Sequence, residues 1–129
     1  MRAKLPIIKQ EFDESTESVK TIHGTIEADI DTSVYSEERW ERFFPEQAKR
    51  EGLFQYVERI TSGSQSLGER AYVASMLKAI FCFIESDELP TYKDFAQLFI
   101  LSDAEYVNNL ITQLSKLFRA IIGDSATKN

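Results

Sequence analysis

The sequence has few of the residues from which catalytic and metal-binding sites are built. Its 129 residues include one histidine, His23, and one cysteine, Cys82. A lone cysteine cannot form an internal disulfide bond, and these two residues cannot make a Cys/His zinc cluster. A glycine-rich phosphate-binding loop is also missing. We therefore predict no enzyme active site, no metal and no cofactor, and we interpret Cys82 as a core residue and His23 as an exposed turn residue.

The chain is also short of basic charge and of long hydrophobic runs. It has 21 acidic against 15 basic residues, a formal net charge of −6 and a pI of about 4.8. Such a surface repels phosphate backbones and anionic membranes, which argues against a nucleic-acid or membrane partner. No stretch approaches the roughly 20 apolar residues of a membrane span, and the first residues lack the apolar run of a signal peptide. We expect a soluble protein of a reducing cytosol.

What the sequence does contain is one long amphipathic segment, residues 67–86, around which the rest can pack. Its apolar residues recur at helical spacing, and from residue 79 to 84 they occur nearly all the way round the helix. Ser66 and Glu69 have the spacing of an N-terminal capping box. We predict that this helix is buried and that the other segments pack against it.

The segments before this helix are predicted to be a tail, a hairpin and two helices. Residues 1–16 are interpreted as an N-terminal tail or arm. Residues 18–31 alternate apolar and polar side chains on either side of His23-Gly24, which predicts a β-hairpin that turns there. A lone hairpin is marginally stable, so it needs helices beneath it or a third strand from a partner. Residues 36–44 and 46–61 show helical spacing.

Two more helices are predicted after the central one. Thr91 and Asp94 open a short helix over residues 91–100. Ser102 and Glu105 have the spacing of another capping box, and the helix that follows is predicted to end at Gly123.

These elements predict a mainly α protein with a small N-terminal β-hairpin, that is, a compact helical domain of about four to five helices. Residues 17–123 form its single globular domain, with the hairpin at 18–31 and the helices within 36–122. Residues 124–129 are predicted to be a polar tail.

Aromatic residues are numerous for a chain of this size, with nine phenylalanines, five tyrosines and one tryptophan. The simplest interpretation is that they fill the core. Two of the predicted helices are short, however, and aromatic anchors in partly exposed patches are typical of protein interfaces. The candidate partner-binding surface consists of Trp40, Phe43, Phe44, Phe95 and Phe99.

An acidic motif invites a calcium interpretation, because Asp29, Asp31 and Ser33 have the spacing of the first ligands of an EF-hand loop. That loop also needs glycine at its sixth position and glutamate at its twelfth. Val34 and Trp40 occupy these positions, so no metal site is predicted.

Larger segments carry a family resemblance. They are the acidic helix start at residues 36–39, Trp40, Phe44-Pro45, Leu53-Phe54, and the blocks at residues 76–86 and 90–99. Together they resemble the tail assembly chaperone family of long-tailed bacteriophages and prophages of Gram-positive bacteria. The resemblance extends from about Leu5 to the C-terminus and includes no catalytic motif.

The resemblance implies a small, mostly helical, non-catalytic protein of the bacterial host cytoplasm that is not retained in the mature virion. It implies binding to the tape-measure protein, whose hydrophobic helices are kept soluble, and to tail-tube subunits during tail morphogenesis. Many members also have a longer form made by ribosomal frameshifting. Two alternatives stay open: a structural phage head–tail or tail component, and a small regulatory protein-binding module. Self-association into a homo-oligomer also stays open.

Overall fold

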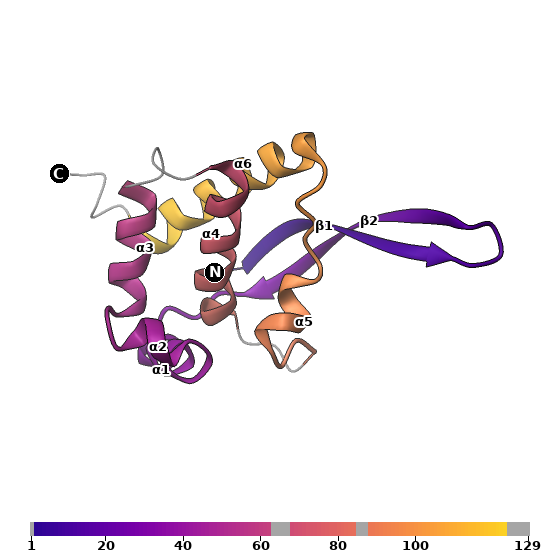
Figure 1. Ribbon diagram of the computed structural model, residues 1–129. Coiled ribbons are helices and arrows are strands. Elements are labelled where there is room, and N and C mark those ends of the chain that lie inside the picture. The colour runs from indigo at the N-terminus through magenta and orange to yellow at the C-terminus, as the bar shows by residue number, and fades with distance from the viewer. Residues whose placement is uncertain (1, 63–67, 85–87, 124–129) are drawn as a thin grey trace.

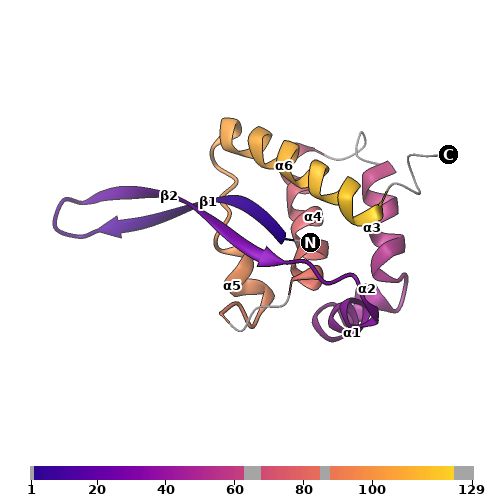
Figure 2. The same cartoon turned by 180° about the vertical axis from the view of Figure 1, so that it is seen from behind.

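The computed structural model describes residues 2–62, 68–84 and 88–123. The predicted polar tail at residues 124–129 lies outside these ranges. Within them the chain forms a two-stranded antiparallel ribbon followed by six helices. The helices pack into one body, and the ribbon leaves that body as a long projection (Figures 1 and 2).

The predicted fold class, mainly α with a small hairpin, is wrong. The ribbon consists of β1 (Arg2–Asp13) and β2 (Ser18–Asp29), and these strands pair along their whole length. Just after β2, Ile30 forms an isolated antiparallel bridge with Ile84, which continues the antiparallel pairing beyond the ribbon. The protein therefore combines a helical body with an extended antiparallel sheet.

The error lies in the choice of turn. His23-Gly24 is not a turn but lies inside β2, where His23 pairs with Ile8 and Gly24 with Ile7. The chain reverses at residues 14–17, where Glu17 has the left-handed φ of 51° that such a reversal requires. The apolar–polar alternation of β2 was read correctly, but its partner strand is the segment interpreted as a tail.

The first three helices follow from local signals. Helix α1 (Val34–Phe43) begins after Ser33, whose hydroxyl accepts a hydrogen bond from the Tyr35 amide at 3.2 Å. Pro45 opens the short α2 (Pro45–Ala48), where its fixed φ and missing N–H do no harm. Helix α3 (Leu53–Ser62) follows directly after Gly52, so the helical run expected over residues 46–61 is divided between α2 and α3.

The remaining helices are α4 (Glu69–Phe83), α5 (Tyr92–Ala96) and α6 (Ala104–Ile122). The predicted Thr91 cap is confirmed, since Thr91 and Asp94 form a capping box, and Gly123 ends α6 with a φ of 85°. Asp103, not Ser102, caps α6. Ser66 lies outside the described residues, and Gly68 precedes α4 without a side-chain cap.

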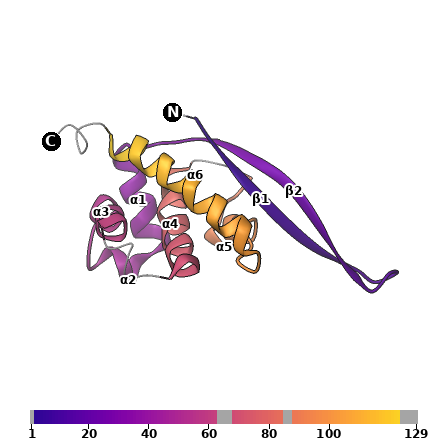
Figure 3. The same ribbon diagram turned by 90° about the horizontal axis from the view of Figure 1, so that it is seen from above.

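Helix α4 lies at the centre of the body, as its apolar pattern predicts. It contacts α1, α3, α5 and α6. In its last eight positions, residues 76–83, every side chain except Lys78 is buried. Viewed from above, α6 crosses α4 and continues alongside β1 (Figure 3). The helical body therefore supports the ribbon near its base, and the distal part projects beyond the body. The candidate site lies on this distal part.

Candidate protein-binding site

The five aromatic residues predicted to form a partner-binding surface lie in the core or at its edge. Trp40 and Phe95 have no exposed area and Phe99 is 7% exposed, so these three side chains belong to the core. The Trp40 indole N–H donates to the Glu51 carbonyl at 3.0 Å, which satisfies its one polar atom. These buried rings present no surface to a partner.

Phe43 and Phe44 are half-buried at the edge of the same aromatic cluster. Phe43 meets Phe81 edge-on, with ring centroids 4.8 Å apart, and the Arg39 guanidinium lies over the Phe81 ring at 5.2 Å. Arg39 also donates to the Phe81 carbonyl at 3.1 Å, near the C-terminal end of α4, where a cation is favourable. Packing explains most of what these side chains do.

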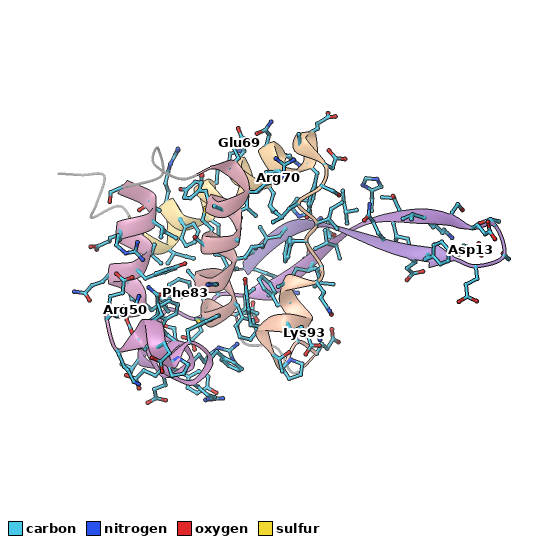
Figure 4. The ribbon with its side chains drawn as sticks, in the orientation of Figure 1. Asp13, Arg50, Glu69, Arg70, Phe83 and Lys93 are labelled. Carbon is cyan, nitrogen blue, oxygen red and sulfur yellow. The ribbon has the colours of Figure 1, made fainter. Side chains whose placement is uncertain are left out.

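Of the five exposed large apolar side chains in the described residues, three lie on the distal ribbon, residues 9–22, which we call the arm, and Val34 and Tyr35 lie on α1. Phe12 is 65% exposed, Val19 59% and Ile22 37%. Phe12 and Val19 are cross-strand partners, so they form one apolar pair on one face of the arm. The distal part of the ribbon projects away from the described helices (Figure 4).

The tip of the arm is acidic. Asp13, Glu14 and Glu17 lie at or beside the turn, and Asp13 is seen at the far end of the projection (Figure 4). The Asp13 carboxylate accepts hydrogen bonds from the Ser15 hydroxyl at 2.6 Å and the Ser15 amide at 2.9 Å. These bonds lower the pKa of Asp13, so its carboxylate stays charged to a lower pH than that of an ordinary aspartate.

Just before the arm begins, at what we call its base, the ribbon is fixed to the body by two hydrogen bonds. The Ile8 amide donates to the Leu98 carbonyl at 3.2 Å, and the Tyr106 hydroxyl on α6 donates to the Pro6 carbonyl at 2.8 Å. Burial raises the pKa of Tyr106 to about 12, so the hydroxyl keeps its proton and remains a donor. Ile8 and Leu5 are also buried against the body. The arm therefore projects in a defined direction.

An open hollow of about 630 Å³ lies where the arm leaves the body, between the ribbon and the start of α6. Asp103, Glu105 and His23 are among its lining residues. The Tyr106 hydroxyl, which also lines it, is already engaged with Pro6. The hollow therefore extends the acidic surface of the arm toward the body.

A cluster of metal-binding side chains is not found in the part of the chain that the structure describes. There, no three His, Cys, Asp or Glu residues lie close enough together to hold a metal ion. Cys82 is fully buried, and burial raises the pKa of its thiol to about 12.

No helix in the described ranges is long and apolar enough to cross a membrane. Comparison of the chain with models of known protein families, with curated proteins and with solved structures finds no match.

Sequence reasoning overlooked Phe12, Val19 and Ile22. The sequence does contain the signal of a longer hairpin, because two segments of strand-like composition flank the polar residues 13–18. In the first of these segments, Ala3, Leu5 and Ile7 alternate with polar or proline positions. It was missed because the acidic turn was interpreted as part of a solvated tail.

Proposed function

We propose that this protein is a non-catalytic tail assembly chaperone that binds the tape-measure protein, and tail-tube subunits, during the morphogenesis of a phage tail. The class of client comes from the resemblance of the helical segments described above. The arm supplies the means, because a chaperone of this kind needs accessible apolar side chains that contact hydrophobic segments of a client.

The observation that carries the proposal is the exposure of the Phe12–Val19 pair at the end of a firmly held ribbon. A pair of this size in water is costly to leave uncovered, since full burial of a phenylalanine or valine side chain is worth about 1.5–3 kcal/mol. Its position far from the helical body leaves it accessible to a large partner. This arrangement is typical of a binding arm and serves no purpose in the packing of the chain itself.

The proposal is tested by co-expressing the full chain with the tape-measure protein of the phage or prophage that encodes it. We expect the chain to raise the soluble fraction of the tape-measure protein several-fold and to co-purify with it. An unrelated acidic helical protein serves as the control for non-specific solubilisation. Failure of the chain to change solubility, or its retention in purified virions, would overturn the chaperone role.

The binding surface is tested with two variants in the same assay. The double variant Phe12→Ser, Val19→Thr removes the exposed apolar pair. The threonine keeps a residue of high strand propensity at position 19. Val34→Thr is the matched control, because Val34 is 77% exposed but lies on α1, away from the arm. We expect the arm variant to lose the rescue and the control to keep it.

A further inference from the structure

We propose that the outer edge of β2 is a docking site for an extended segment of a partner protein, which adds to the ribbon as a third strand and carries alternating apolar and basic side chains. This inference goes beyond the proposed function, because it concerns how a partner binds and holds for whichever protein supplies the strand.

The direction of the backbone groups follows from the contacts at the base of the arm. The Ile8 amide donates to Leu98, outside the ribbon, so Ile8 and its partner His23 form a pair whose backbone groups point away from each other. Because such pairs alternate along an antiparallel ladder, the Gln10–Thr21 and Phe12–Val19 pairs also direct their N–H and C=O groups outward. Each strand therefore carries its own row of outward groups.

The outer edge of β1 is protected from strand addition. Pro6 stands at an outward-facing position and has no N–H to donate, and the Ile8 amide is already bonded to Leu98. Proline and a covering segment are two of the devices by which proteins block sheet edges. Only the outward groups of Gln10 and Phe12 are left on the distal part of this edge.

The outer edge of β2 carries no such protection. The outward positions Val19, Thr21, His23 and Thr25 include no proline, and no backbone group in the described residues bonds to them from outside the ribbon. All four residues are exposed. A two-stranded ribbon without support is marginal, and a third strand is the usual remedy.

Charge decides the occupant. Residues 9–24 contain four carboxylates (Glu11, Asp13, Glu14 and Glu17) against two lysines, and the whole chain has a net charge of −6. If a second copy occupied this edge, its β2 would run antiparallel to the first. Glu17 of the second copy would then approach the end of β2 that carries Glu27, so like charges would meet. A partner strand with lysine or arginine between apolar residues complements both the acidic tip and the exposed Val19.

The test uses a fluorescently labelled peptide that alternates valine and lysine, with a valine–glutamate peptide as the charge control. The variants are Thr21→Pro, which removes an outward N–H from β2, and Gln10→Pro, which removes the outward N–H of its cross-strand partner on β1. Pro6 shows that the ribbon accepts proline at a position of this type. The two variants therefore disturb the same pair and differ only in the edge they block.

We expect the full chain to bind the lysine peptide and not the glutamate peptide. Thr21→Pro should weaken binding at least about tenfold, while Gln10→Pro changes it by less than about twofold. Equal binding by both variants, or preference for the glutamate peptide, would overturn the proposal. If both prolines abolish binding, amide hydrogen exchange of the unmodified chain decides, because the peptide should protect Thr21 and His23 but not Gln10 and Phe12.

Self-association is the competing outcome. A chain that sediments as a dimer, and that Thr21→Pro converts to a monomer, would show that a second copy occupies this edge and would overturn the partner strand. The peptide assay does not involve the tape-measure protein. Its failure and the failure of the chaperone role are therefore observed in separate experiments.

Discussion

The carboxylate of Glu37, on α1, accepts a hydrogen bond from the backbone amide of Leu53, the first residue of α3, at 3.0 Å. The Phe54 amide donates to the other oxygen at 3.4 Å. Glu37 therefore caps a helix that begins 16 residues further along the chain, and its negative charge lies at the favourable N-terminal end.

Removal of this cap should destabilise the protein. We expect Glu37→Ala to lower the free energy of unfolding by about 1 kcal/mol, the usual cost of a lost N-cap. Chemical denaturation measures the change. Glu38→Ala is the matched control, because Glu38 is the next residue of α1 and is exposed; an equal loss in both variants would contradict the capping role.

The hydrogen bond from Tyr106 to Pro6 predicts a second effect. Tyr106→Phe removes the hydroxyl and leaves the Pro6 carbonyl without its donor, which should cost about 1 kcal/mol of stability. Because the bond ties the base of the arm to α6, hydrogen exchange of the Ile8 amide should also accelerate. Tyr72→Phe serves as control, since Tyr72 is half-buried and the described residues offer its hydroxyl no partner.

The pair formed by Glu51 and Arg59 predicts a pH dependence. Hydrogen bonding from Arg59, at 2.7 Å from the guanidinium, lowers the pKa of Glu51 below its ordinary value of 4.5. A carboxyl group whose pKa is lowered by folding stabilises the native state above its unfolded pKa. That contribution is therefore present at neutral pH and is lost as the pH falls from about 4.5 through the lower, folded pKa.

Denaturation of wild type and Arg59→Gln at several pH values measures this contribution. The variant should be less stable by about 0.5–1 kcal/mol at neutral pH, because Arg59 is largely exposed, and the difference should vanish in acid. Lys49→Gln should have little effect, since both partners of the Lys49–Glu46 pair are at least 73% exposed. A difference that persists unchanged below pH 4 would rule out the pairing as its cause.

The contrast between buried and exposed phenylalanines predicts opposite outcomes. Phe95→Ala empties a fully buried site that contacts Phe81 and Phe99, and should cost about 3–5 kcal/mol. Phe12→Ala, at 65% exposure, should change stability by no more than about 0.5 kcal/mol. Thermal or chemical unfolding of the two variants compares them directly, and similar losses would place Phe12 in the core.

The sequence by itself determined the elements that depend on neighbouring residues. The central helix, the long C-terminal helix with its Gly123 end, and the Thr91–Asp94 cap all follow from spacing within a few residues, because helix hydrogen bonds and caps are local. The alternation in β2 was equally legible, since it needs only the two faces of a strand.

Only the tertiary structure decided which segments pair and which side chains stay exposed. Residues 2–13 form a strand because they pair with β2 on the other side of the acidic turn. Glu37 acts as a cap because packing places its carboxylate next to the Leu53 amide. Burial of Trp40, Phe95 and Phe99, and exposure of Phe12 and Val19, likewise depend on where α4 and the arm lie. Strand pairing and burial depend on contacts between residues far apart in the chain, and a local sequence pattern does not identify the distant residue that each one contacts.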